Sequence, residues 1–329
     1  MKNALEIGRL HLKNGNLSAA IEVFTEVIRL TPKMSVAFSL RACAYRNQGR
    51  FHRAIEDLTQ SIQLNPKNAF AFQARGEIFA KLCDNQKAIA DFTMLIQLNE
   101  KDANAYFLKS LVHTKCEDSY DEAITDLTLA IKLDPQFVSA FYNRGWLFKE
   151  QGQFENAIAD FTVAIQLSPE DANSYAHRGM AYGKLGSFEN SIADLTEVIR
   201  IEPTAADAYR NRGIAYEKNG DLVSAISDYT ESIRLDPSEY LALCFRGRAL
   251  MESSDFASAF ADLASAIRIR SNNPLAFNIR GEVYSKTGDS LKSEKDFDHA
   301  RALTTKQGQV RMALTSRNLS VSKGEALLR

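Results

Sequence analysis

Charged residues that could form ion pairs recur at a fixed separation along this chain of 329 residues. A guanidinium group can donate two parallel hydrogen bonds to one carboxylate, which makes such a pair strong and directional. The pairs are Arg41 with Asp57, Arg75 with Asp91, Arg144 with Asp160, Arg178 with Asp194, Arg212 with Asp228, Arg246 with Asp262, Arg280 with Asp296 and, with a lysine, Lys109 with Asp126. Near the N-terminus both members change together, to Ile7 and Val23. This joint change predicts structural ion pairs rather than catalytic groups.

No arrangement typical of an active site or a metal site accompanies these pairs. Four of the five histidines and all four cysteines lack the spacing of metal ligands. Motifs for nucleotide binding or nucleophilic catalysis are also absent from the sequence. We therefore expect no enzymatic activity, no cofactor and no metal. The residues concerned are His11, His52, His113, His299, Cys43, Cys83, Cys116 and Cys244.

The elements that must position the ion pairs are short amphipathic helices. Phe141, Trp146 and Phe148 lie at helical spacing ahead of Gly152. An apolar stripe follows and stops at Pro169. A pair of helices like this cannot bury its stripe alone, which predicts a stack of such pairs. The pattern has a period of 34 residues, marked by Pro32, Pro66, Pro135, Pro169, Pro203 and Pro237.

This repeat resembles the tetratricopeptide repeat family, in the type that carries an Arg-Gly pair in the first helix. The family pattern has an aromatic at position 4, Gly at 8, Tyr at 11, Ala at 20, an aromatic at 24, Ala at 27 and Pro at 32. The fifth repeat matches it with Phe141, Gly145, Phe148, Ala157, Phe161, Ala164 and Pro169. At position 15, Cys83 replaces the usual Gly of the third repeat, and one residue is inserted near Cys116 to Tyr120. A looser or longer turn is expected at both places.

The resemblance implies an all-α fold, a right-handed superhelical solenoid of nine tandem helix-turn-helix repeats with a short C-terminal capping segment. We expect two helices in each repeat, at about positions 1–14 and 18–31. The repeats fill residues 1–307, and residues 308–329 form a capping helix and a basic tail. The expected repeats are 1–34, 35–68, 69–102, 103–137, 138–171, 172–205, 206–239, 240–273 and 274–307.

Charge and hydropathy exclude several classes of partner. Lys and Arg number 40 against 41 Asp and Glu, so no excess of basic charge favours nucleic acid. No run of eighteen apolar residues predicts insertion into a membrane. The chain starts directly with a predicted repeat helix and its cysteines look unpaired, so we expect a cytoplasmic protein, with the nucleus as the alternative. A fragment of a longer repeat array is an alternative to a complete chain.

The resemblance also implies where a partner binds. In this family positions 2, 5, 6, 9, 12 and 13 of the first helices line a concave groove, and aromatic and arginine side chains gather there in the middle repeats. The expected groove residues are Phe107, Leu111, Tyr142, Asn143, Trp146, His177, Met180, Arg210 and Asn211. The alternative is that Tyr142 and Trp146 only pack between neighbouring first helices. The clamp that holds the C-terminus of heat-shock chaperones is absent, because no three consecutive repeats carry its residues.

These features together predict a non-enzymatic scaffold or adaptor for protein–protein interaction. Its expected ligand is a peptide segment of a partner protein, bound in the concave groove. Two alternatives belong to other classes. One is the partner-binding region of a larger enzyme, for example a glycosyltransferase. The other is a self-assembling structural array, which exposed apolar ends would favour.

Overall fold

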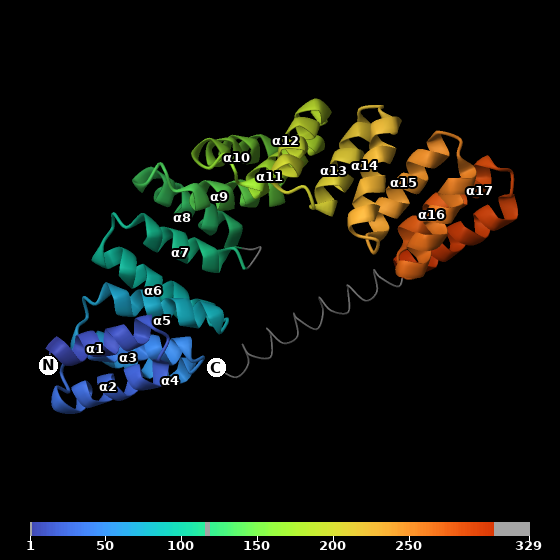
Figure 1. The fold of residues 1–329 in the computed structure, drawn as a ribbon. Helices are drawn as coiled ribbons and strands as arrows, with labels where there is room; N and C mark the ends of the chain where they lie inside the picture. Colours follow the sequence, from blue (N-terminus) through green and yellow to red (C-terminus); the bar gives the residue numbers. More distant parts are fainter. Residues whose placement is uncertain (1, 116–118, 306–329) are drawn as a thin grey trace, which may run out of the picture. The chain divides into compact units, whose positions relative to one another are not determined.

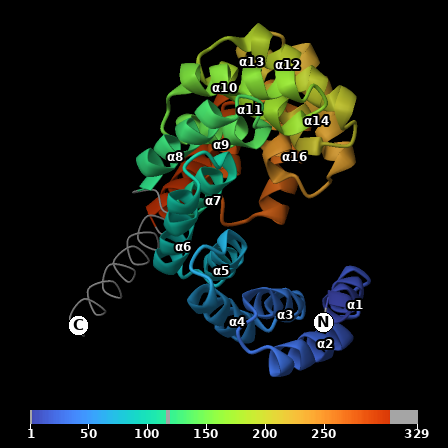
Figure 2. The same cartoon turned by 90° about the vertical axis from the view of Figure 1, so that its left-hand side faces the viewer.

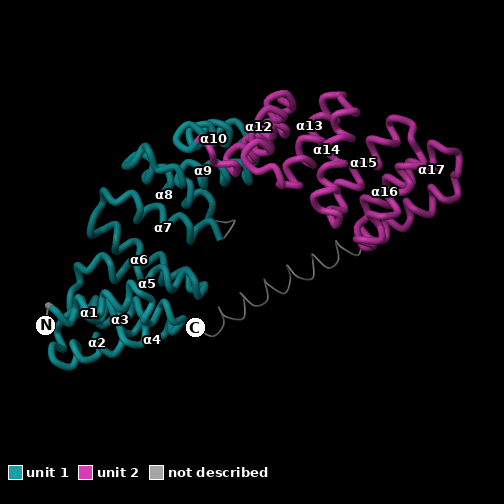
Figure 3. The backbone as a smooth tube through the Cα atoms, in the orientation of Figure 1, with its two compact units in different colours: residues 1–168 teal, residues 169–329 magenta. Residues whose placement is uncertain are grey.

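The computed structural model describes residues 2–115 and 119–305, and nearly all of the ordered structure in these ranges is helical. No strand occurs in them, which confirms the predicted all-α fold. The predicted cap and tail at 308–329 lie outside the described residues, as does Cys116. By its internal contacts the chain divides into two compact units, Met1–Ser168 and Pro169–Arg329, which Figure 3 colours separately.

The described residues of the first unit form a stack of ten α-helices, in which each helix packs against the next in the chain (Figure 1). Their bounds follow the predicted repeat within a few residues. The helices are α1 (Lys2–Lys13), α2 (Leu17–Leu30), α3 (Ser35–Asn47), α4 (Phe51–Leu64), α5 (Ala69–Lys81), α6 (Asn85–Leu98), α7 (Ala103–His113), α8 (Tyr120–Leu133), α9 (Val138–Glu150) and α10 (Phe154–Leu167).

The second unit continues the same alternation of first and second repeat helices. A further helical segment, residues 290–305, follows α17 and completes the last described pair. The labelled helices are α11 (Ala172–Lys184), α12 (Phe188–Ile201), α13 (Ala206–Lys218), α14 (Leu222–Leu235), α15 (Tyr240–Glu252), α16 (Phe256–Ile269) and α17 (Pro274–Lys286). The division of the chain into nine repeats with the boundaries given above stays a prediction.

Small residues set how closely the two helices of a pair approach. At Gly76 a Cβ atom would lie only 2.7 Å from Cε1 of Phe92, so the ring of α6 packs directly on the backbone of α5. Gly152 ends the turn after α9 with φ of +76°, a backbone conformation that glycine adopts without strain. The sequence therefore encodes both the close packing and the sharp reversal between helices.

The turn after α5 differs from the expectation of a looser or longer connection. Cys83 adopts φ of +61°, close to the value of the turn glycines, and the turn has the same length as the one between α9 and α10. The residue accepts the strained conformation because the packing of the two flanking helices fixes the path of the chain. The insertion near Cys116 has a different effect, since α7 ends at His113 and α8 begins only at Tyr120.

In each unit the odd-numbered helices form a row of their own. α1 contacts α3, α3 contacts α5 and α5 contacts α7, and the same holds for α11, α13, α15 and α17. Among the described residues no comparable contact joins one even-numbered helix to the next. A row whose members lie closer together is on the inside of a curved stack, so α1, α3, α5 and α7 belong to the inner face of the first unit, and α11, α13, α15 and α17 to that of the second. By the alternation of the repeat, α9 continues the inner row of the first unit, whose helices Figures 1 and 2 show.

Candidate interaction surface

Most of the recurring arginines are held by groups from three helices, and Arg144 of α9 illustrates the arrangement. Its Nε and Nη2 donate to the carboxylate of Asp160 on α10 at 2.8 and 2.7 Å, and its Nη1 donates to Thr128 Oγ1 on α8 at 3.0 Å. The guanidinium carbon also lies 5.9 Å from the ring centre of Phe141 and 5.8 Å from that of Phe148. The cation therefore joins two helices of one repeat to the preceding repeat.

The contact with aspartate returns in all the other repeats that carry an arginine, and the contact with threonine in most of them. Every predicted arginine–aspartate pair has two hydrogen bonds, with N–O distances of 2.7 to 2.9 Å. A threonine of the preceding repeat accepts a third bond from Arg41, Arg75, Arg212 and Arg246. The hydrogen bond to its aspartate raises the pKa of each of four arginines, namely Arg41, Arg178, Arg212 and Arg280.

These pairs are mostly buried. The side chain of Arg144 is 17% exposed and that of Asp160 is 7% exposed. A charge that is already bonded in this way offers little to a ligand, because breaking the pair would leave the partner charge buried. The arrangement therefore assigns these residues to the fold rather than to a binding site.

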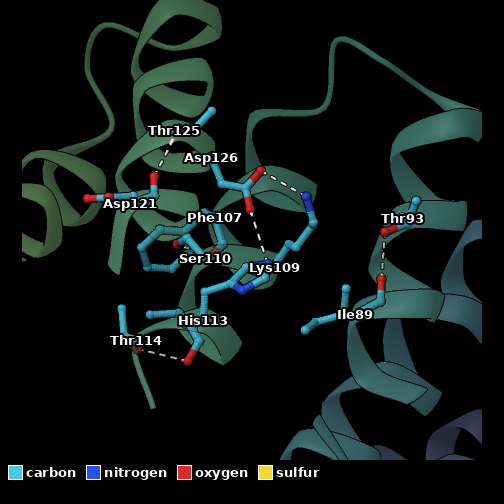
Figure 4. Close-up of polar contacts among 11 residues, drawn as sticks. Ile89, Thr93, Phe107, Lys109, Ser110, His113, Thr114, Asp121, Thr125 and Asp126 are labelled. Atoms are coloured by element: carbon cyan, nitrogen blue, oxygen red, sulfur yellow. Dashed lines mark hydrogen bonds and ion pairs between the residues drawn. The ribbon is translucent and has the colours of Figure 1, made fainter. Parts of the chain in front are cut away.

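The fourth repeat departs from this arrangement, as Figure 4 shows. Lys109 Nζ donates to Asp126 Oδ1 at 3.0 Å, and Asp126 Oδ2 is buried without a hydrogen bond. His113 Nε2 lies 3.8 Å from that oxygen, which is too far for a hydrogen bond. Burial raises the pKa of Asp126, and the bond from Lys109 opposes this rise. A lysine cannot supply the two-pronged contact that arginine makes elsewhere.

Five of the expected groove residues belong to the first unit and are partly buried on α7 and α9. The ring of Phe107 lies 4.8 Å from that of Phe137, and Trp146 lies 6.2 Å from Tyr120. Both also pack against the buried core between α8 and α9. Part of the surface of Phe107 and of Trp146 is therefore used inside the stack.

The other three expected groove residues of the first unit also contact their surroundings in the stack or are partly buried there. Tyr142 packs edge-on against the buried Phe161, with ring centres 5.9 Å apart. Asn143 Nδ2 donates to the Ser139 carbonyl of its own helix at 2.7 Å. Leu111 is partly buried on α7. All three are partly exposed.

The other four expected groove residues belong to the second unit. Arg210 of α13 forms an ion pair with Glu239 at 2.5 Å, and each side chain is only 17% exposed. Its Nη2 also lies 3.4 Å from Asn211 Oδ1. Arg210 is therefore already neutralised by the residue that caps α15. His177 and Met180 are partly buried on α11.

Two residues of the inner face were not among the expected groove residues. Val36 on α3 and Phe70 on α5 are 46% and 49% exposed, and these two helices contact each other. Both stand at position 2 of their repeats, one of the positions that the family pattern places in the groove. Further along the same two helices, Arg46 and Glu77 pair at 3.0 Å.

The described residues contain no cluster of three or more His, Cys, Asp or Glu that could hold a metal ion. Across the same residues, no helix has the length and apolar character to cross a bilayer. Cys43, Cys83 and Cys244 are free thiols, and burial raises the pKa of Cys43 and brings that of Cys244 to about 12. Thiols with raised pKa values are poor nucleophiles at neutral pH.

Models of the tetratricopeptide repeat family match more than half of the chain. The matched residues are 3–34, 35–68, 206–239 and 224–274 for models described as tetratricopeptide repeat, and 117–152, 145–186 and 179–220 for one described as TPR repeat. The chain therefore belongs to the tetratricopeptide repeat family. A search of curated proteins gave no match.

Solved structures with the same fold include three repeat proteins. The C-terminal part of a TPR protein from Cytophaga hutchinsonii is 18% identical, with 73% of this chain and 98% of that chain covered and a TM-score of 0.63. A tetratricopeptide repeat protein from Parabacteroides merdae is 19% identical, with 76% and 98% covered and a TM-score of 0.53. YrrB, described as a TPR protein with an unusual peptide-binding site, is 22% identical, with 57% and 97% covered and a TM-score of 0.52. At these identities the likeness concerns the fold alone.

Proposed function

We propose that this protein is a non-enzymatic scaffold that binds a peptide segment of a partner protein on the inner face of its odd-numbered helices. The observation that carries the proposal is the distribution of side chains on that face in the first unit. Phe107, Tyr142 and Trp146 are aromatic residues that pack against the helical core and are still partly exposed, and Phe70 on α5 is 49% exposed. Aromatic residues in such a setting commonly dominate the energy of protein recognition.

The electrostatics of this face favour a particular kind of segment. The recurring arginines are bonded to aspartates, and Arg46 is paired with Glu77. A ligand therefore meets aromatic surface beside paired arginines, and we expect a segment with apolar or aromatic anchors. Burying such anchors contributes about 25 cal/mol for each Å² of apolar surface removed from water.

Peptide selection followed by substitution tests this proposal. Peptides are selected from a random display library on the full chain, and their affinities are measured for Tyr142→Ala, Trp146→Ala and a control, Val223→Ala. Val223 is 82% exposed on the even-numbered helix α14. We expect at least a tenfold loss of affinity for the first two variants, equivalent to about 1.4 kcal/mol, and no change for the control.

Unchanged affinity in both aromatic variants, with circular dichroism showing an intact fold, would contradict the proposal. The binding surface would then lie on the even-numbered helices or in another part of the chain. A cytoplasmic location is also proposed, and fractionation of cells that produce the protein checks it.

A further inference from the structure

The two described parts of the chain carry opposite net charge. Lys and Arg outnumber Asp and Glu by 16 to 10 in residues 2–115. In residues 119–305 Asp and Glu outnumber Lys and Arg by 28 to 19. The nearly neutral total therefore hides a basic N-terminal part. An acidic ligand that responds to this difference is attracted to residues 2–115.

A small cleft of about 340 Å³ lies in this basic part, among α3, α4 and α5. These three helices pack side by side, as Figures 1 and 2 show. Ile78 is 1% exposed and Phe51 packs against the same buried core, and together they supply the apolar lining of the cleft. Its polar lining consists of Arg46, Asn47, Glu77 and Lys81.

Two cations and one carboxylate line this cleft, so its net charge is positive. Arg46 Nη1 donates to Glu77 Oε2 at 3.0 Å, and Gln73 Nε2 donates to Glu77 Oε1 at 2.9 Å. The side chain of Arg46 is 36% exposed and has further N–H groups besides the one bonded to Glu77. Lys81 Nζ lies 5.0 Å from the ring centre of Phe51 and forms no ion pair with a carboxylate of the described residues.

We propose that this cleft binds the carboxylate of an Asp or Glu side chain in the partner's peptide segment. Lys81 Nζ, the remaining N–H groups of Arg46 and the side-chain amide of Asn47 donate hydrogen bonds to it. The methylene groups of that side chain cover the apolar lining of the cleft. The inference rests on the proposed function in that it takes the ligand to be a peptide segment on the inner face, to which α3 and α5 belong.

Glu77 favours a peptide over a nucleic acid as the ligand. Its carboxylate also lines the cleft, where it repels the continuous negative charge of a phosphate backbone. A peptide brings a single carboxylate to Lys81 and also has backbone N–H groups, from which Glu77 can accept hydrogen bonds. The mixed charges of the cleft therefore match a peptide with one acidic side chain at this place.

A simpler role for Lys81 is to balance the partial negative charge at the C-terminal end of α5, where it is the last residue. Lys184 is likewise the last residue of α11, and it is exposed. It belongs to the second unit and does not line this cleft. Lys184→Glu therefore makes the same change at a helix end without altering the cleft, and it is the matched control for Lys81→Glu.

Selection combined with charge reversal tests the inference. Peptides are selected from a random display library on the full chain and, separately, on the full chain with Lys81→Glu. Wild type should enrich Asp or Glu at one peptide position, and Lys81→Glu should enrich Lys or Arg there. Peptides selected on wild type should lose affinity about tenfold, or about 1.4 kcal/mol, in Lys81→Glu and keep it in Lys184→Glu. Circular dichroism checks that both variants stay folded.

The outcomes separate this inference from the proposed function. Peptides without an enriched acidic residue, or equal losses in Lys81→Glu and Lys184→Glu, would overturn the inference. If these peptides still lose affinity in Tyr142→Ala and Trp146→Ala, the proposed function stands without it. Acidic peptides that depend on Lys81 but on neither aromatic residue would support the cleft and contradict the proposed function as stated. Single-stranded DNA that displaces the peptides would assign the cleft to nucleic acid and overturn the inference.

Discussion

Replacing Lys109 by arginine should stabilise the fourth repeat. Asp126 has a side chain only 6% exposed, and its Oδ2 accepts no hydrogen bond. An arginine at this position can donate to both carboxylate oxygens, as Arg144 does to Asp160. A buried acceptor without a partner costs about 1–3 kcal/mol, and a hydrogen bond between charged groups contributes about 1.5–3 kcal/mol. Since ordering the longer side chain offsets part of this, we expect a gain of about 1–2 kcal/mol in the free energy of unfolding.

The gain should depend on pH in a definite direction. Burial places the pKa of Asp126 above its ordinary value of 3.8. A group with a raised folded-state pKa contributes stability below its unfolded pKa, and that contribution is lost as pH rises through the folded value. An arginine donates a second hydrogen bond to the carboxylate and so lowers the pKa of Asp126 in the folded state. This lowering restores the stability that is lost at neutral pH. The benefit of Lys109→Arg should therefore be full at neutral pH and small below pH 3.8.

Hydrogen exchange is the suitable assay, because repeat proteins open locally as well as globally. Amides of α7 and α8 should exchange about tenfold more slowly in Lys109→Arg at neutral pH, which corresponds to about 1.4 kcal/mol. The reverse substitution, Arg144→Lys, is the matched control and should speed exchange in α9 and α10. Equal exchange in Lys109→Arg and wild type, or a gain that persists unchanged below pH 3.8, would refute this reasoning.

Two further predictions concern stability. Arg144→Leu alone should cost about 3 kcal/mol, because it leaves Asp160 charged and buried, and Arg144→Leu with Asp160→Tyr should recover much of this loss; strictly additive losses in thermal melts would rule out the coupling. Cys83→Gly should raise the free energy of unfolding by about 1 kcal/mol, since φ of +61° strains any residue with a Cβ atom. Urea unfolding checks this second change, with Gly152→Ala as a control of opposite sign, and a loss of stability in Cys83→Gly would contradict it.

Much of the fold could be predicted from the sequence because each repeat restates the same local signals. Apolar spacing, turn glycines and terminal prolines placed the helices within a few residues of their observed bounds. The sixteen-residue separation of arginine and aspartate corresponds to two facing positions of a helix pair, and the structure brings these groups together at 2.7 to 2.9 Å. The threonine that accepts the third bond was missed, although Thr128 and its equivalents recur at one repeat position.

Less of the candidate site could be predicted, because it depends on contacts between neighbouring repeats. Arg210 was expected in the groove, and its partner Glu239 is the residue that caps α15, the first helix of the next repeat, where helix spacing gives no information on side-chain direction. Phe70 is 49% exposed because the neighbouring helices leave much of its side chain uncovered, and the spacing of residues within one repeat does not predict this. At Cys83 the residue type led to a wrong prediction, because the residue adopts the positive φ of the turn glycines although a side chain disfavours it.

The most direct test of the proposed function is to map where a selected peptide touches the protein. A photoreactive group is placed at the apolar anchor of the peptide, and mass spectrometry identifies the residues to which it couples. Binding on the inner face predicts cross-links to α5, α7 and α9 of the first unit, around Phe70, Phe107 and Trp146. Cross-links confined to the even-numbered helices would contradict it.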